Sequence, residues 1–198
     1  MLGYNNLQEY SEQYRQKTCD LQGHSVRTFD GILVDLPETD CYKVVTTDCS
    51  PLNVFTVLAK STQSQTFPKA VRIFLANTTI DIGPNESGPV VLVNGERVPV
   101  TKDKPYSHDV LGAELFYVEA VQRYYLFNSN SHGLYVLFNG QLLFVQAAPF
   151  YRGKLCGLCG NYNYERQNEL RGPDNRLYDD TLAFAKSYVV PSENCNLS

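Results

Sequence analysis

The sequence predicts an all-β protein: an antiparallel β-sandwich with one short C-terminal helix, stapled by disulfides. Short runs of alternating apolar and polar residues follow one another between turn-forming residues, as in sheets with one face in a core. Two Asn-Gly pairs, Asn94-Gly95 and Asn139-Gly140, separate such runs and are typical of tight hairpins between antiparallel strands. The 198 residues include six cysteines, an even number that suits an oxidising, secretory compartment.

The expected strands share this alternation or are rich in β-branched and aromatic residues. Residues 41–49 form a strand with a cysteine at each end, and residues 71–75 alternate so that one face lies in a core. The two Asn-Gly pairs join four further runs into hairpins. The expected strands are residues 41–49, 53–60, 71–75, 90–93, 97–100, 115–121, 123–127, 134–138 and 142–146. Such a meander of short strands predicts a sandwich.

One helix is expected near the C-terminus. Asp179, Asp180 or Thr181 can cap its first turn, and Pro191 ends it. Its buried face is expected to carry Leu182, Ala185, Tyr188 and Val189. The sequence has no repeat and no Pro/Ser-rich linker, so residues 18–198 are expected to form one domain.

Residues 1–17 are interpreted as a lead-in segment before that domain. Leu7, Tyr10 and Tyr14 lie at helical spacing, so the segment can form a short amphipathic helix. The segment lacks the apolar centre of a signal peptide, and no apolar run in the sequence is long enough to span a bilayer. We therefore expect an extracellular module of a longer, secreted protein.

The distribution of charge bears on the partners of the chain, and its sequons indicate which asparagines are exposed. The formal charge is −4 with scattered lysine and arginine, so we expect no nucleic-acid partner. N-glycosylation sequons begin at Asn77, Asn85 and Asn196. We expect Asn77, after a strand, and Asn85, in the turn-forming run 83–89, to be exposed and able to carry glycans.

Residues 156–170 carry the highest density of chemically useful groups. Asn161, Asn163 and Glu165 alternate before the pair Asn168-Glu169, which is how a loop directs several oxygens at one hard cation such as Ca²⁺. The loop is not an EF-hand, because its sixth position is an arginine and its twelfth a glycine. An ordinary solvated turn is the alternative interpretation of this spacing.

Enzymatic interpretations have weaker support. Cys156-x-x-Cys159 has the spacing of a thiol-disulfide oxidoreductase, but it follows strands rather than opening a helix in a βαβ unit. A zinc site would need a second pair of ligands, and His24, His108 and His132 are isolated in the sequence. Hydrolase, metalloprotease and nucleotide-binding motifs are absent. We expect no catalytic activity.

The motif CGLCGNYN at residues 156–163, the following Asn-Glu pair and the upstream segment Thr28-Phe29-Asp30-Gly31 resemble the von Willebrand factor type D domain. With residues 41–49 the resemblance covers roughly residues 18–195. It implies the disulfides Cys19–Cys159, Cys41–Cys195 and Cys49–Cys156. It also implies one Ca²⁺ bound by the side chains of Asp30, Asn161, Asn163, Asn168 and Glu169 and by the backbone carbonyl of Glu165. The family commonly has aspartate at positions 163 and 169, so a weaker site is expected.

The chain has few cysteines, the segment CYKVVTTDC at residues 41–49 and the ending FAKSYV at residues 184–189. With these features it looks most like the modules of vitellogenin-type large lipid transfer proteins, which include yolk storage and clottable proteins. That resemblance implies the other domains of a parent chain as partners, a receptor or another protein as a further one, and lipid only through the parent. The alternative host is a mucin-like or von Willebrand factor-like multimerising or adhesive protein, whose modules usually carry more cysteines.

Overall fold

The computed structural model describes residues 17–192 and Cys195. The expected lead-in helix and the sequon at Asn196 lie outside the described residues, and the division of the chain at residue 18 stays a prediction. In the part that is described, no helix is both long enough and apolar enough to cross a membrane.

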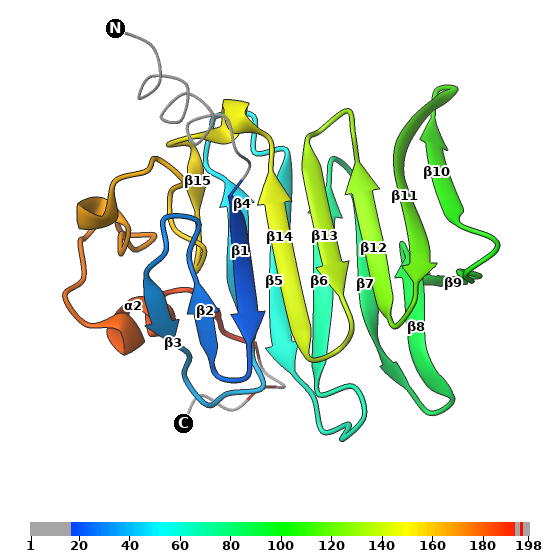
Figure 1. The fold of residues 1–198 in the computed structure, drawn as a ribbon, viewed down its shortest axis with the longest axis horizontal. Helices are drawn as coiled ribbons and strands as arrows, with labels where there is room; N and C mark the ends of the chain where they lie inside the picture. The colour runs from blue at the N-terminus through cyan, green and yellow to red at the C-terminus, as the bar shows by residue number, and fades with distance from the viewer. Residues whose placement is uncertain (1–16, 193–194, 196–198) are drawn as a thin grey trace, which may run out of the picture.

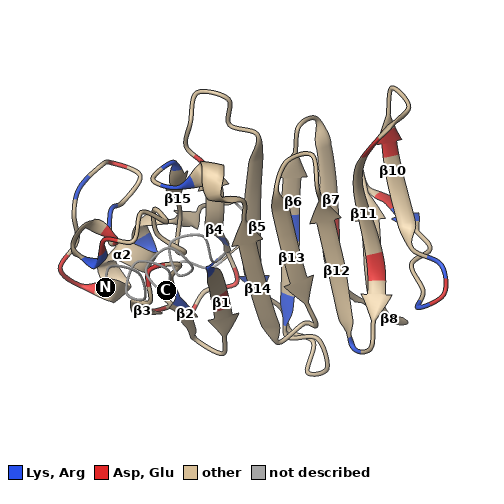
Figure 2. Ribbon diagram, turned by 45° about the horizontal axis from the view of Figure 1, so that its top comes forward, with Lys and Arg blue, Asp and Glu red and all other residues tan. Residues whose placement is uncertain are grey.

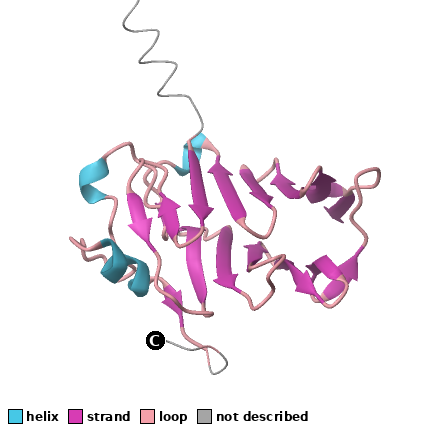
Figure 3. Cartoon of the chain, turned by 60° about the horizontal axis from the view of Figure 1, so that its bottom comes forward, coloured by secondary structure: helices cyan, strands magenta, loops and turns pink. Residues whose placement is uncertain are grey.

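Two antiparallel sheets face each other (Figures 1 and 3). The first contains, in spatial order, β10 (Tyr106–Val110), β11 (Ala113–Val121), β12 (Tyr124–Ser129), β13 (Leu134–Phe138), β14 (Leu142–Ala147), β1 (Thr18–Gln22), β2 (Ser25–Arg27) and β3 (Leu33–Asp35). The second contains β15 (Leu155–Cys156), β4 (Tyr42–Asp48), β5 (Phe55–Ser61), β6 (Lys69–Leu75), β7 (Thr78–Asn85), β8 (Gly88–Val93) and β9 (Glu96–Val98), and β16 (Val189–Val190) also pairs with β4. The predicted all-β sandwich is confirmed.

The inward-facing residues of neighbouring strands form continuous apolar rows. In the second sheet Val57, Ile73 and Ile80 lie side by side on β5, β6 and β7. In the first sheet Phe127 and Val136 are paired on β12 and β13. All five are completely buried. Because side chains alternate along a strand, this register directs the apolar set of each sheet into the shared core.

The two Asn-Gly hairpins differ in their turns. Asn94 and Gly95 both have positive φ, 52° and 83°, which gives the predicted two-residue turn between β8 and β9. The loop between β13 and β14 has three residues instead. In it Gly140 has a φ of 87°, and Oδ1 of Asn139 accepts hydrogen bonds from the backbone of Gln141 and Leu142. The asparagine side chain thus caps this turn, and the loop consists of the same residues 139–141 that the expected strands leave between them.

The run 83–89 is mostly strand rather than turn. Residues 83–85 end β7 and residues 88–89 begin β8, so the turn consists of Glu86 and Ser87. Asn85 is exposed at the end of β7, and Asn77 is exposed in the turn between β6 and β7. Both asparagines are therefore placed where a glycan meets solvent, as expected, and the glycans themselves stay a prediction.

The predicted helix is α2 (Thr181–Ser187), and Asp180 caps it by accepting a 2.6 Å hydrogen bond from the backbone N–H of Ala183. Its buried side chains are Phe184 and Ala185, whereas Leu182 is 38% exposed. The prediction that Val189 belongs to the helix is wrong. It lies in β16, because the chain leaves the helix at Tyr188 and pairs with the edge of β4.

Helix α2, the short 3₁₀ turns η1 (Pro149–Tyr151) and η2 (Arg166–Asn168), and the long C-terminal loops gather near the β15, β4, β2 and β3 strands (Figure 1). The cysteines are joined as Cys19–Cys159, Cys41–Cys195 and Cys49–Cys156, the pairs that the resemblance implies. Lysine and arginine are scattered among aspartate and glutamate along the ribbon (Figure 2).

Strand β4 positions the cysteine-rich loop. Beyond β15 the chain continues along β4, where the N–H groups of Leu158 and Cys159 donate to the carbonyl oxygens of Val44 and Val45. Gly157 has a φ of 118°, and a Cβ on it would lie 2.7 Å from the carbonyl oxygen of Val45. A glycine is required at 157 because the backbone of the loop lies directly on the backbone of β4.

Candidate functional site

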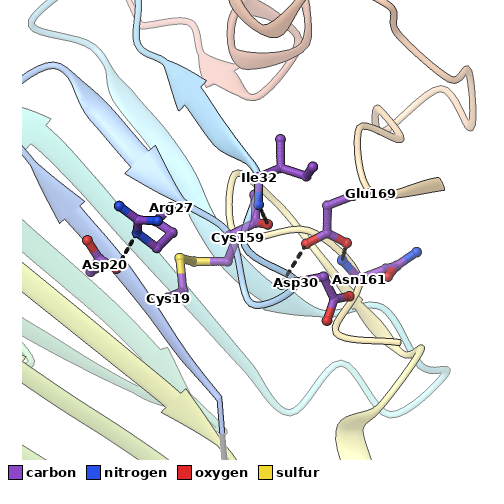
Figure 4. Close-up of a disulfide and its surroundings, with 9 residues drawn as sticks. Cys19, Asp20, Arg27, Asp30, Ile32, Cys159, Asn161 and Glu169 are labelled. Carbon is purple, nitrogen blue, oxygen red and sulfur yellow. Dashed lines mark hydrogen bonds and ion pairs between the residues drawn. A yellow bond between two sulfur atoms is a disulfide. The ribbon is translucent and has the colours of Figure 1, made fainter. Parts of the chain in front are cut away.

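The candidate site lies where the turn after β2 meets the loop after β15. The backbone N–H of Phe29 donates to the carbonyl oxygen of Cys159 at 2.9 Å, and Cys159 is bonded to Cys19 of β1. Asp30 and Glu169 lie beside this connection, and the carboxylate of Glu169 points toward the backbone N–H of Asp30 (Figure 4). The disulfide and the backbone bond thus bring together two segments that are more than a hundred positions apart.

Two buried aromatic rings anchor these segments. The ring of Phe29 packs against that of Tyr162, with centroids 4.9 Å apart, and both side chains are buried. Their neighbours in sequence, Asp30, Asn161 and Asn163, are polar. The apolar residues hold the two segments in the core, which leaves the polar residues facing one another at its boundary.

Backbone N–H groups hold the carboxylate of Asp30. Its Oδ2 accepts hydrogen bonds from the N–H groups of Asn163 and Tyr164, each at 3.0 Å. Tyr162 and Tyr164 have positive φ angles of 58° and 71°, an alternation that turns successive N–H groups toward one anion. The side chain of Asp30 has no exposed surface.

A lysine ammonium contacts the other oxygen of Asp30. Nζ of Lys17 lies 3.1 Å from Oδ1 of Asp30 and 4.0 Å from the centroid of the Tyr164 ring. The guanidinium of Arg152 lies over the same ring at 4.6 Å. Among the described residues, Lys17 is therefore a positive neighbour of this carboxylate, held by an ion pair and by a cation–π contact.

Glu169 is the second buried carboxylate of the site and is 1% exposed. Its Oε1 accepts the backbone N–H of Asp30 and its Oε2 that of Asn161, both at 3.3 Å. Burial raises the pKa of Glu169 to about 7; hydrogen bonding to the Thr28 side chain opposes this shift, and the negative charge of Asp30 adds to it. The site thus disfavours two negative charges unless further positive charge is supplied.

Gly160 makes room for this carboxylate. It has a φ of 78°, and a Cβ on it would overlap the carboxylate of Glu169. A glycine is therefore required at position 160 for two reasons: the positive φ of its backbone and the close approach of the Glu169 carboxylate.

Three asparagine side chains converge beside the carboxylates. Oδ1 of Asn168 accepts hydrogen bonds from Nδ2 of Asn161 at 2.9 Å and from Nδ2 of Asn163 at 3.1 Å. Oδ1 of Asn163 accepts the N–H of Glu165 at 2.8 Å, and the carboxylate of Glu165 accepts Nδ2 of Asn168 at 3.0 Å. Together with Asp30 and Glu169, these residues form one hydrogen-bonded network. It contains all six residues implied by the resemblance.

The donor set fits a hard cation. It offers carboxylate and carboxamide oxygens and no sulfur or imidazole, the ligand type that Ca²⁺ prefers. The pKa of Glu169 is raised in part by Asp30, so a divalent ion between the two would relieve their repulsion. Glu165 enters the network through its N–H and its carboxylate, and its role as a carbonyl ligand stays a prediction.

The described cysteines and histidines lie outside this network. Cys156 and Cys159 are bonded to Cys49 and Cys19, so the two thiols of the Cys-x-x-Cys motif are not bonded to each other. Asp40 is close to Cys41 and Cys195, but both sulfurs belong to one disulfide. The histidines have other neighbours: His108 stacks on Phe116, His132 accepts from or donates to Ser129 and Ser131, and His24 lies in the turn before β2.

A cavity of about 370 Å³ adjoins the network on the side of Glu169. Asn161 and Glu169 line one part of it, and the Cys49–Cys156 disulfide lines another. Asp30 does not line it. The two carboxylates therefore have different surroundings, Lys17 beside Asp30 and the cavity beside Glu169.

Comparison of the whole sequence with known proteins identifies the family to which the chain belongs. The model of the von Willebrand factor type D domain matches residues 19–176. The chain belongs to this family. Vitellogenin-6 of Oscheius tipulae is 26% identical to this type D domain over 186 residues, vitellogenin-5 of Caenorhabditis elegans 31% over 180, and vitellogenin-2 of Gallus gallus 28% over 179. These stretches cover 94%, 91% and 89% of the chain, but 11%, 11% and 10% of the relatives, so it spans about a tenth of their length.

Two contacts in the site of this type D domain, those of Lys17 and Tyr164 with Asp30, were not predicted from the sequence. Lys17 stands just before β1 in a polar stretch, and nothing in its spacing connects it with Asp30. Tyr164 directly follows the motif CGLCGNYN, and its role comes from a positive φ and from its N–H, which donates to the carboxylate of Asp30. Both contacts depend on the three-dimensional approach of the two loops.

Proposed function

We propose that this type D domain is a non-catalytic, calcium-stabilised module of a secreted, vitellogenin-like protein. The observation that carries the proposal is the burial of Asp30 and Glu169 together between two loops, with the pKa of Glu169 raised to about 7. A pair of buried carboxylates with one neighbouring ammonium is a favourable environment for a divalent cation.

The residues that would hold the ion are Asp30 and Glu169 through carboxylate oxygens, Asn161, Asn163 and Asn168 through carboxamide oxygens, and Glu165 through its backbone carbonyl. Bound calcium would supply positive charge between the two loops and so stabilise their junction. The domain itself prepares the site, because the Phe29–Tyr162 contact and the Cys19–Cys159 bridge already hold the loops together.

An extracellular, structural role is supported by the disulfides and by the relatives. Each of the three bridges closes a long segment, with sequence separations of 140, 154 and 107, which suits an oxidising compartment. The relatives named above are vitellogenins, and the chain spans about a tenth of their length. We infer that the main partners of the module are other domains of such a parent and that lipid is carried by the parent. Binding to a receptor or another protein would also occur in that context.

The pairing in the structure counts against a thiol-disulfide oxidoreductase. Such an enzyme cycles a bond between the two cysteines of its motif. Here Cys159 is joined to Cys19 of β1 and Cys156 to Cys49, just after β4, and Cys159 is completely buried. A structural role for both cysteines is therefore the better supported one.

Isothermal titration with CaCl₂ at pH 7.5 tests the calcium proposal. The wild-type chain is expected to bind one ion, with an affinity in the range of roughly 10⁻⁴ to 10⁻³ M typical of extracellular modules. Asp30→Asn should abolish this binding, whereas Asp103→Asn, which removes the same charge from an exposed turn, should keep it. Absence of heat in the wild type, confirmed by equilibrium dialysis with ⁴⁵Ca, would contradict the proposal.

A further inference from the structure

Lys17 contacts the carboxylate oxygen of Asp30 that a metal ion would use. Oδ2 is occupied by the N–H groups of Asn163 and Tyr164, which the loop backbone holds in place. Oδ1 contacts Nζ of Lys17 at 3.1 Å. A metal ion that uses Asp30 as a ligand would therefore have to use the oxygen that Lys17 now contacts.

Lys17 is placed so that it can leave. Its side chain is 32% exposed, whereas that of Asp30 is fully buried. Lysine holds its partner by a single ammonium on a flexible stem, so the ammonium can leave Oδ1 by rotation of its own side chain. Movement of Lys17 toward solvent would disturb neither the buried rings nor the disulfide.

We propose that Lys17 is an affinity-determining residue for the calcium site: its ammonium neutralises Asp30 in the calcium-free domain and must leave Oδ1 before an ion binds there. This inference rests on the proposed calcium function. A buried carboxylate without a counter-ion is strongly unfavourable, so Lys17 stabilises the calcium-free domain. Two cations at one oxygen repel each other, so the same contact weakens calcium binding.

Calcium titration of matched lysine variants of the full chain tests this inference. Lys17→Met is expected to lower the calcium Kd by about tenfold, since it removes the competing charge but keeps an unbranched stem. Lys102→Met removes an equal charge from an exposed turn and should stay within about twofold of the wild type. Lys17→Arg keeps a positive charge beside Asp30 and should retain an affinity close to that of the wild type. In chelator, Lys17→Met should melt below both the wild type and Lys102→Met.

Chemical labelling of lysine amines gives a second measurement that does not depend on the variants. Reductive methylation followed by peptide mass spectrometry should label Lys17 of the wild type several-fold faster in calcium than in chelator, while Lys102 reacts equally in both. Equal calcium Kd values for Lys17→Met and Lys102→Met, or labelling of Lys17 that calcium does not change, would overturn the inference while wild-type binding left the proposed function intact. Absence of binding in the wild type and in every variant would instead overturn the proposed function.

Discussion

The backbone N–H of Asp30 donates a hydrogen bond to Oε1 of Glu169 at 3.3 Å, although 139 positions of sequence separate the two residues. The other oxygen of Glu169 accepts the N–H of Asn161, also at 3.3 Å. One buried carboxylate therefore joins both loops of the candidate site. These hydrogen bonds link the two loops, and a bound ion would strengthen the same junction.

The raised pKa of Glu169 predicts that, in chelator, the free energy of unfolding decreases as the pH rises through 7. The folded-state pKa of about 7 is above the usual glutamate value of 4.5. The protonated form is thus favoured by folding: its stabilisation is fully present below pH 4.5 and is lost as the pH rises through 7. In chelator, the unfolding free energy of the wild type should fall from pH 5 to pH 8, relative to Glu169→Gln, by no more than about 3 kcal/mol.

Urea unfolding at several pH values, for both proteins, measures this difference directly. Calcium should reverse the trend, because an ion favours the ionised carboxylate and a proton competes with it. The stabilisation by calcium is expected to be largest near pH 8 and to decrease below pH 7. If the wild type and Glu169→Gln had parallel pH profiles in chelator, the buried carboxyl would not titrate as the structure implies.

Gly160→Ala should disrupt the site more than a comparable glycine substitution elsewhere. Gly160 and Gly95 have similar φ angles of 78° and 83°, so alanine suffers similar backbone strain at both positions. A Cβ at 95 meets open space, whereas one at 160 overlaps Glu169. Gly95→Ala is expected to lose about 1 kcal/mol of stability, and Gly160→Ala several kcal/mol together with calcium binding. Chemical denaturation and calcium titration compare the two, and equal losses would contradict the close approach at Gly160.

The disulfides should differ in their effect on the calcium site. Cys19–Cys159 and Cys41–Cys195 close segments of similar length, with separations of 140 and 154, so each stabilises the fold by about 5 kcal/mol on the chain-entropy model. Cys159 also accepts the N–H of Phe29, next to Asp30. Cys19→Ala with Cys159→Ala should therefore weaken calcium binding by tenfold or more, beyond its effect on stability.

The paired variant Cys41→Ala with Cys195→Ala is the control. It removes a bridge of similar length away from the network and should keep the calcium Kd of the wild type. Titrations at a temperature where circular dichroism shows both variants folded make the comparison. Equal weakening in both would show that the bridges support the site only through global stability.

Local sequence signals predicted much of the fold. The alternation in residues 71–75 correctly assigned Val71, Ile73 and Leu75 to the core, and Asn94-Gly95 correctly predicted its hairpin. The failures are tertiary in origin. Val189 follows a helical pattern but pairs with Lys43, because the edge of β4 offers free backbone groups that a short helix end cannot match.

Only part of the site could be predicted from the sequence. Residues close together in the loop, such as Asn161 and Asn163, could be grouped by spacing, and the resemblance added Asp30 from far upstream. The ion pair of Lys17 with Asp30 could not be predicted, because it forms only where two segments meet in the folded structure and leaves no pattern in the local sequence. Burial of Glu169 also has no local signal, because an Asn-Glu pair in a loop is ordinarily solvated.

Thermal unfolding in calcium and in chelator tests the central claim most directly. At pH 7.5, a hundredfold excess of calcium over its Kd should raise the melting temperature of the wild type by roughly 5 to 10 °C. The double variant Asp30→Ala, Asn161→Ala should melt at the same temperature in calcium and in chelator, because it lacks one ligand from each loop. Equal melting of the wild type in excess calcium and in chelator would contradict a calcium-stabilised junction between the two loops.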